Sequence, residues 1–267
     1  MDHEDRSRAG SPGPRTLSLD VGGSGLKAAV LGPDGGIEGA RLRIPTPSPA
    51  PPDVLLDSLA GLAAQLPAFD RIAAGFPGVI RSGHVLAAVN LGAQDAWRGF
   101  DITGALEQRL GKPARVLNDA EVQGLGVIEG RGLEMVVTLG TGFGTGLFLD
   151  GRPTPHLEIA HHPFRRGDTY EDQLGEKALK KAGAKKWNRR LLRAIETLRA
   201  LTNFERLYLG GGNARAITFE PDADVTIVSN TAGILGGIAL WRDEDLQNED
   251  PPGRDRQGGE RPGQEPG

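Results

Sequence analysis

The sequence has 267 residues and a formal net charge of -4, and it contains no cysteine. This length allows one large domain or two lobes with an ample core. The absence of cysteine excludes disulfides, thiolate catalysis and cysteine-based zinc sites. The mild acidity gives no reason to expect nucleic acid or an anionic membrane as a partner. No apolar run approaches the roughly eighteen residues of a membrane span, so we expect a cytoplasmic protein.

Both ends of the chain are polar, and the sequence between them alternates strands with helices. Residues 1–15 and 247–267 are punctuated by Gly and Pro and lack hydrophobic periodicity, so we predict that both tails are disordered. Predicted strands cover residues 16–20, 28–31, 37–44, 72–76, 79–89 (as a hairpin), 114–117, 134–139, 146–150, 206–209 and 225–228. Predicted helices cover residues 53–65, 101–110, 120–129, 170–182, 185–202 and 232–240. This alternation predicts an α/β fold.

One pattern occurs twice. A strand, a glycine-rich turn, a second strand and an Asp-Gly turn span residues 16–36 and again 134–151. Glycine brings backbone N–H groups close to an anion with no Cβ in the way, so we interpret the repeat as two phosphate-binding β-hairpins. The duplication predicts a two-lobed kinase of the actin-like and ribonuclease-H-like type. We place a smaller N-terminal α/β lobe at 16–115, rejoined by the helix 232–240, and a larger C-terminal α/β lobe at 116–231.

The pair Asn118-Asp119 ends an apolar predicted strand at residues 114–117. Ligand sites in α/β folds lie at the carboxyl ends of strands. A carboxylate close to a phosphate-binding turn indicates phosphoryl transfer to a hydroxyl, with Asp119 as the candidate base. The alternative is that Asn118 and Asp119 only cap the helix that follows them.

Seven motifs in one order resemble the ROK family of sugar kinases, and within it the polyphosphate glucokinase branch. The motifs are residues 20–27 (DVGGSGLK), 75–78 (GFPG), 118–120 (NDA), 138–146 (TLGTGFGTG), Glu158 with His161, 209–213 (LGGGN) and 230–234 (NTAGI). Each motif alone is weak, because glycine turns after strands are common. Their number and order make the resemblance specific, and it extends from Leu19 to Leu240.

The sequence departs from most of the family at its zinc motif. The cysteine cluster that follows the Glu-x-x-His pair in the family is missing, and residues 168–171 (DTYE) occupy its place. The polyphosphate glucokinase branch also lacks these cysteines, so we expect Mg²⁺ and no zinc. The helix-turn-helix arm of ROK repressors is absent as well, and DNA binding is not expected. The resemblance further implies a homodimer.

The resemblance assigns roles to individual residues. Asp119 is the implied general base for phosphorylation of the 6-hydroxyl of glucose or a related hexose. The implied sugar-binding residues are Asn90, Asn118, Glu158, His161 and Glu171. The implied donor-binding residues are Gly22, Gly23, Ser24, Lys27, Thr141, Gly142, Thr145, Gly210, Gly211 and Gly212. Asp20 would orient Mg²⁺ through water. His161 could instead be a metal ligand, and Lys27 a solvated strand residue.

The resemblance implies inorganic polyphosphate as the phosphoryl donor, and ATP is the alternative. The glycines at 210–212 resemble the family's nucleotide-binding turn. Residues 165–193 are dense in Lys and Arg, and Lys185, Lys186, Arg189 and Arg190 could hold a polyphosphate chain through counterion release. The alternative for these four residues is a solvated helix face. Two other functions stay open: a strictly ATP-dependent kinase for glucose, mannose or an N-acetylhexosamine, and a sugar-sensing protein without catalysis.

Overall fold

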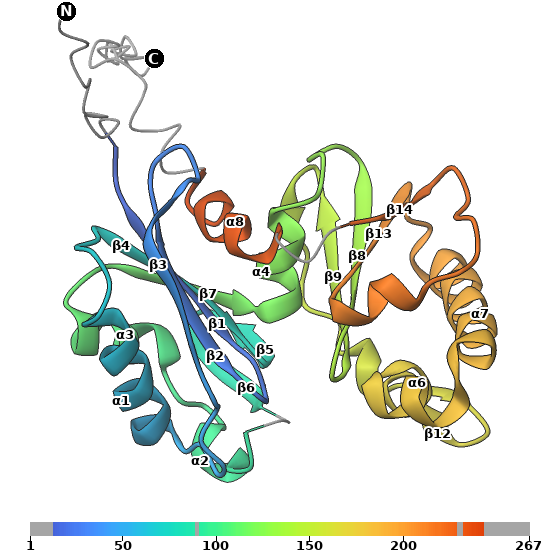
Figure 1. The fold of residues 1–267 in the computed structure, drawn as a ribbon, viewed down its shortest axis with the longest axis horizontal. Helices are drawn as coiled ribbons and strands as arrows, with labels where there is room; N and C mark the ends of the chain where they lie inside the picture. Colours follow the sequence, from blue (N-terminus) through green and yellow to red (C-terminus); the bar gives the residue numbers. More distant parts are fainter. Residues whose placement is uncertain (1–12, 89–90, 229–231, 243–267) are drawn as a thin grey trace, which may run out of the picture.

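The computed structural model describes residues 13–88, 91–228 and 232–242, with residues 232–235 described through their backbone only. Most of the two predicted tails lies outside these ranges, as do Asn90 and the 230–231 part of the last motif. Two five-stranded sheets form two lobes, with two helices between them (Figure 1). None of the helices in the described ranges is long and apolar enough to cross a membrane.

The first lobe is built on a sheet of strand order β3-β2-β1-β4-β7. Its strands are β1 (Thr16–Val21), β2 (Leu26–Leu31), β3 (Ile37–Ile44), β4 (Arg71–Phe76) and β7 (Ala114–Asn118). Helices α1 (Pro52–Ala63) and α3 (Ile102–Leu110) cover one face and build its hydrophobic core. A hairpin, β5 (Gly78–Arg81) with β6 (His84–Ala88), and the short helix α2 (Gln94–Trp97) complete the lobe. The sheet extends to Asn118, past residue 115 where the sequence placed the lobe boundary.

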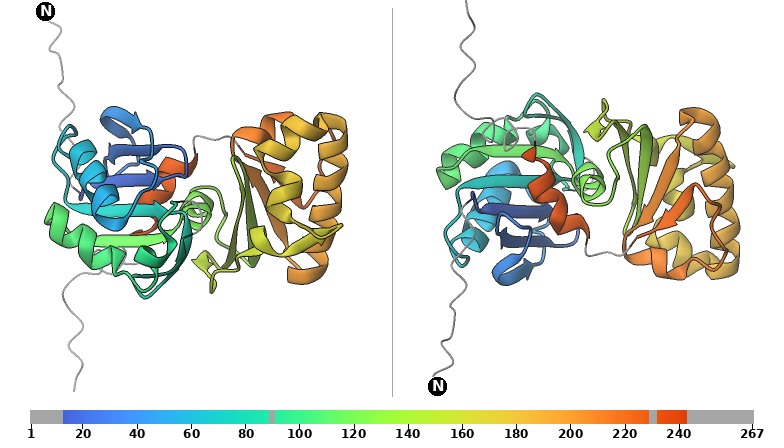
Figure 2. Two further views of the ribbon diagram at one scale, coloured as in Figure 1. Left: turned by 90° about the horizontal axis from the view of Figure 1, so that it is seen from below. Right: turned by 90° about the horizontal axis from the view of Figure 1, so that it is seen from above.

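The second lobe repeats this topology with the order β10-β9-β8-β13-β14. Its strands are β8 (Leu133–Leu139), β9 (Phe143–Leu149), β10 (Arg152–Pro153), β13 (Arg206–Gly210) and β14 (Val225–Ile227). In both sheets an antiparallel hairpin continues into parallel strands. Helices α5 (Tyr170–Leu174), α6 (Glu176–Ala182) and α7 (Ala184–Thr202) cover the outer face, where Trp187 is buried (Figure 2).

Helices α4 (Asp119–Leu125) and α8 (Ala232–Ala239) form the layer between the sheets (Figures 1 and 2). They cross at Gly236, where any Cβ would collide with the Val122 carbonyl oxygen. The glycines of α8 therefore allow the close approach. Helix α8 also packs on β1, β2 and β4, so the C-terminal segment returns to the first lobe.

The predicted helix 170–182 is wrong, because the chain breaks at Gly175 into α5 and α6. Gly175 is extended, and a Cβ there would lie 2.8 Å from the Thr141 carbonyl oxygen. The Glu176 N–H then donates to the Gly140 carbonyl oxygen at 3.0 Å. The break thus lets these helices pack against the second glycine turn.

The predicted helix 120–129 is too long, because α4 ends at Leu125. The buried Glu134 carboxylate accepts hydrogen bonds from the N–H groups of Glu129, Gly130 and Arg131. These hydrogen bonds to Glu134 hold residues 129–131 in a non-helical conformation. The segment around residue 160, which falls between the predicted strands and helices, contains a 3-10 helix, η1 (Ile159–His161), followed by the small strands β11 (Pro163–Arg165) and β12 (Asp168–Thr169). A second 3-10 helix, η2 (Gly212–Ala216), follows β13.

Candidate active site

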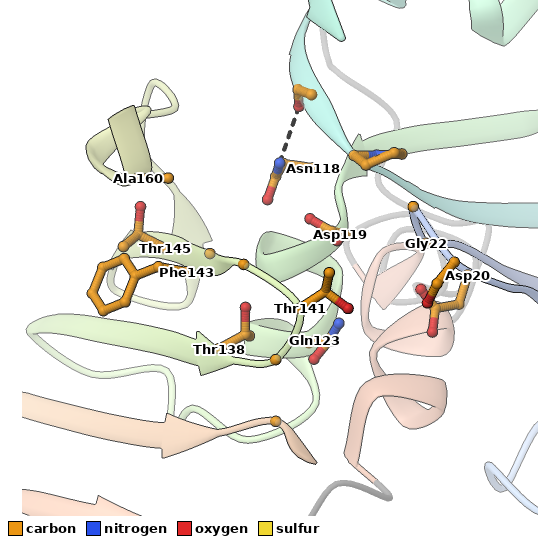
Figure 3. Close-up of a pocket in the computed structure, with 18 of the residues that line it drawn as sticks. Asp20, Gly22, Asn118, Asp119, Gln123, Thr138, Thr141, Phe143, Thr145 and Ala160 are labelled. Carbon is orange, nitrogen blue, oxygen red and sulfur yellow. Dashed lines mark hydrogen bonds between the residues drawn. The ribbon is translucent and has the colours of Figure 1, made fainter. Parts of the chain in front are cut away.

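A cavity of about 390 Å³ lies between the lobes, where the two glycine hairpins and the start of α4 converge (Figure 3). Most of the residues singled out from the sequence line it: Asp20, Gly22, Gly23, Ser24, Lys27, Asn118, Asp119, Thr141, Gly142, Thr145, Glu158, Glu171, Gly211 and Gly212. They come from both lobes and from segments far apart in the chain. The structure therefore gathers the predicted sugar, donor and base residues into one site.

Several predicted residues do not line this cavity. His161 is exposed, and Gly210, the last residue of β13, does not line the cavity, whereas Gly211 and Gly212 do. Asn90 lies outside the described residues. The four basic residues Lys185, Lys186, Arg189 and Arg190 belong to α7, on the outer face of the second sheet and away from the cavity (Figure 1). Their contact with polyphosphate stays a prediction.

Asn118 caps α4 and also faces the cavity. Its Oδ1 accepts the Ala120 N–H at 2.8 Å, and its Nδ2 donates to the Gly78 carbonyl oxygen at 3.0 Å. The Glu121 carboxylate accepts the Asn118 N–H at 3.2 Å and completes a capping box. The capping interpretation is therefore correct for Asn118, and these contacts fix the position of the next residue, Asp119.

Asp119 is the first residue of α4, and its side chain faces the cavity that Thr141 of one hairpin and Asp20 of the other also line (Figure 3). Burial raises the pKa of Asp119 to about 7, with further increases from the charges of Asp20 and Glu158. The Ala120 N–H and the charge of His156 act in the opposite direction. A carboxylate with this pKa is matched to proton abstraction near neutral pH.

The first hairpin presents charge to the cavity. Asp20 and Lys27 face each other across β1 and β2, with Lys27 Nζ 2.7 Å from Asp20 Oδ2. Arg43 is the next residue across the sheet, opposite Lys27, and it also lines the cavity. Arg43 was not predicted from the sequence. The sequence does contain an indication of its position, because Arg43 alternates with Leu42 and Ile44. These two residues pack on the core, so Arg43 lies on the opposite face of the strand.

The second hairpin presents hydroxyls and backbone. Thr138 faces Gly144 across β8 and β9, and the Gly140 N–H donates to the Gly142 carbonyl oxygen at 3.1 Å. Thr145 Oγ1 donates to the Leu157 carbonyl oxygen at 2.9 Å, which anchors the loop that carries Glu158. Glu171 lies against Gly142, because a Cβ on that glycine would collide with the Glu171 carboxylate. Glu171 therefore reaches the cavity beside the second turn.

His156 is the main residue that the sequence analysis missed. Its side chain is 4% exposed, with Nδ1 2.9 Å from Glu121 Oε1 and Nε2 3.4 Å from Glu158 Oε2. Burial lowers the pKa of His156, but its contacts with Glu121 and Glu158 outweigh burial and raise it to about 9. The contact with His156 Nε2, 3.4 Å from Glu158 Oε2, lowers the pKa of Glu158. The Glu-x-x-His spacing drew attention to His161 instead.

Asp20 fits the predicted contact with Mg²⁺. It is the only carboxylate of the first hairpin's cavity wall in the described part of the chain, and it stands beside the Gly22–Gly25 turn. Mg²⁺ binds one or two carboxylates and completes its octahedron with waters and phosphate oxygens. Asp20 together with a bound phosphate supplies that donor set. The described ranges contain no cluster of three acidic or His residues arranged for a metal.

The paired lobes, the repeated sheet topology and the cavity between two glycine hairpins define a two-lobed actin-like, ribonuclease-H-like protein. The model of the ROK family matches residues 16–157, which is more than half of the chain. The chain therefore belongs to the ROK family, as its motifs predict.

Curated relatives and solved structures agree with this assignment. Polyphosphate glucokinase of Mycobacterium tuberculosis (strain H37Rv) is 26% identical over 248 residues, 85% of this chain and 92% of that protein. N-acetylmannosamine kinase of Escherichia coli (strain SE11) is 37% identical over 144 residues, 51% of this chain and 48% of that protein.

Two solved structures share the fold. The inorganic polyphosphate/ATP-glucomannokinase from Arthrobacter sp. strain KM has a TM-score of 0.76 and 29% identity, covering 88% of this chain and all of that one. A ROK family glucokinase from Streptomyces griseus, in complex with glucose and AMPPNP, has a TM-score of 0.70 and 17% identity, covering 86% and 99%. The predicted fold class is confirmed.

Proposed function

We propose that this ROK-family sugar kinase transfers a phosphoryl group from inorganic polyphosphate, and also from ATP, to the 6-hydroxyl of glucose. One observation carries the proposal: Asp119, with its pKa raised to about 7, lies where two phosphate-binding hairpins meet. In this scheme the sugar hydroxyl oxygen bonds to the terminal phosphorus, the bond to the leaving phosphate breaks, and the hydroxyl proton passes to the Asp119 carboxylate.

The other cavity residues align the two substrates and neutralise charge, which is the protein's main task in phosphoryl transfer. Lys27, Arg43 and the backbone N–H groups of both turns would face the donor phosphates. Asn118, Glu158 and Glu171 would hold the sugar, together with Asn90 from the family pattern. His161, which does not line the cavity, would act through its charge on Glu158. When bound at Asp20, Mg²⁺ would offset the charge of the donor phosphates.

Two relatives support the donor assignment, a polyphosphate glucokinase and a polyphosphate/ATP-glucomannokinase. The match to this chain extends over most of the length of each. The basic face of α7 is then a contact for the distal part of a long polyphosphate chain. A strictly ATP-dependent hexose kinase is the second candidate. It is favoured by Gly211 and Gly212, which line the cavity, and by the distance of α7 from it. A cytoplasmic homodimer completes the proposal, and light scattering after gel filtration would test the dimer.

The test is the rate of glucose 6-phosphate formation with Mg²⁺, glucose and either long-chain polyphosphate or ATP as the sole donor. The proposal expects turnover with both donors. Asp119→Asn should lower kcat about a hundredfold to ten-thousandfold, whereas Asp95→Asn, on the exposed face of α2, should not change it. Turnover with ATP alone would favour the second candidate. Turnover that survives Asp119→Asn would exclude Asp119 as the base.

A separate variant tests whether the basic face of α7 binds polyphosphate. Replacing Lys185, Lys186, Arg189 and Arg190 by Gln should raise the KM for long polyphosphate and leave the KM for ATP unchanged. An unchanged KM for polyphosphate in this variant would show that the four residues do not bind the donor.

A further inference from the structure

His156 connects two parts of the site that are distant in sequence. It lies on the loop after β10, whereas Glu121 is the third residue of α4, and both side chains are almost fully buried. Glu158 extends from the same loop to the cavity. Beyond His156, a second cavity of about 1270 Å³ is lined by His156 and Glu121 as well. His156 is therefore part of the wall between the two cavities.

The charges around His156 select its protonated form. A neutral imidazole donates from only one ring nitrogen, whereas the imidazolium donates from both. Nδ1 faces the Glu121 carboxylate and Nε2 faces the Glu158 carboxylate, and the carboxylate of Asp119 lies close enough to interact with the same charge. A buried charge is tolerated when it is paired, and here an opposite charge lies on each side.

The contacts extend from the sugar side of the cavity to the candidate base. Glu121 binds His156 through Oε1 and accepts the Asn118 N–H through Oε2. That N–H begins the capping box of α4, whose first residue is Asp119. The position of Glu158 is thus connected, through His156 and Glu121, to the helix end that holds Asp119.

We propose that His156 is a positioning residue that, as an imidazolium, holds the Glu158 carboxylate against the sugar and ties it to the capped start of α4. This inference rests on the proposed function, because it assigns Glu158 to the sugar. Without His156, the carboxylates of Glu121 and Glu158 face each other with no cation between them. Glu158 then turns away from the sugar, and Asp119 loses a nearby positive charge.

The experiment compares His156→Gln with His84→Gln, a change at an exposed histidine of β6. His156→Gln removes the cation paired with Glu158 at 3.4 Å, so KM for glucose should rise about tenfold to a hundredfold. The KM for the donor should change less than about threefold, because the ion pairs of His156 are with Glu121 and Glu158 and not with the cations proposed to bind the donor. The acid limb of kcat/KM should also move to higher pH, because His156 lowers the pKa of Asp119. His84→Gln should match the wild type.

A double-mutant cycle separates positioning from a general structural role. If His156 acts through Glu158, His156→Gln should add little to the loss already caused by Glu158→Gln. Fully additive effects, equal rises in KM for sugar and donor, or an unchanged KM for glucose in His156→Gln would each overturn the inference.

The wild type provides a readout that needs no variant, in case His156→Gln does not fold. The ¹⁵N shifts of both His156 ring nitrogens should report an imidazolium at pH 7.5, and a neutral ring would overturn the inference. The two proposals fail differently. A wild type without turnover or glucose binding refutes the proposed function, whereas an active wild type with an unchanged His156→Gln refutes the positioning role alone.

Discussion

The two glycine hairpins have the same place in their sheets but different chemistry. In each, the penultimate residue of the first strand faces the second residue of the next strand, which gives Asp20 opposite Lys27 in one lobe and Thr138 opposite Gly144 in the other. An ion pair in the first hairpin thus corresponds to a hydroxyl and a glycine in the second. The repeated backbone forms two turns that line the same cavity, and their side chains differ in chemistry.

The surroundings explain the difference. Asp20 and Lys27 are open to the cavity, with side chains 27% and 34% exposed. The second hairpin packs against α4 instead, and a Cβ on Gly144 would lie 3.0 Å from the Ala120 Cβ and collide with Thr138 Oγ1. Small side chains there let the start of α4, and with it Asp119, approach the turn. The first hairpin therefore supplies charge, and the second positions Asp119, the proposed base.

The largest effect is expected where a side chain would break the second hairpin's contact with α4. Gly144→Val should lower the free energy of unfolding by about 1–3 kcal/mol, as overpacking does, and should abolish most turnover because Asp119 shifts. Chemical denaturation and the glucose 6-phosphate assay measure both. Gly61→Ala, in a helix position with open space, is the control and should be neutral or stabilising. A stable and active Gly144→Val would refute the positional role.

A smaller effect, on the KM for the donor, should distinguish the charged residues of the first hairpin from the hydroxyl of the second. Lys27→Gln or Arg43→Gln should raise the KM for the donor about tenfold to a hundredfold, because each removes a charged contact to phosphate. Thr138→Val should raise it only about twofold to tenfold, as the loss of a neutral hydrogen bond does. The salt dependence of KM should also flatten for the two cation variants and not for Thr138→Val. Equal effects in both hairpins would contradict the division of roles.

The smallest effect concerns the influence of one hairpin on the base held by the other. The charge of Asp20 raises the pKa of Asp119, so Asp20→Asn should move the acid limb of kcat/KM to lower pH. Its kcat should also fall, but the position of the limb is the informative quantity. Asp95→Asn should leave the limb in place. A limb that does not move in Asp20→Asn would show that the two carboxyls are not coupled.

The sequence predicted what depends on local pattern. The strands, the repeated hairpins and the Asn-Asp pair at a strand end can each be recognised from a few neighbouring residues. The predicted base Asp119 therefore was correctly placed in the cavity. The features that were not predicted depend on contacts between residues far apart in the sequence. His156 is 35 residues from Glu121, and the break at Gly175 exists because a turn more than thirty residues earlier packs against it.

The position of a charged residue relative to the sheets also could not be predicted from the sequence. The basic residues of α7 are conspicuous in sequence, but nothing local shows that their helix covers the outer face of a sheet. Arg43 is inconspicuous in sequence, yet the register of β3 with β2 places it opposite Lys27 at the cavity. Charge density is a local property, and proximity to a site is not.

The pH dependence of kcat/KM in the wild type tests the central claim most directly, because it reports the pKa of the free enzyme's base. Asp119 acts only when deprotonated, so the rate should rise with pH and reach half its plateau at about pH 7. The limb should vanish in Asp119→Asn. A half-maximal rate near pH 4, typical of an exposed aspartate, or a limb that persists in Asp119→Asn would contradict the account.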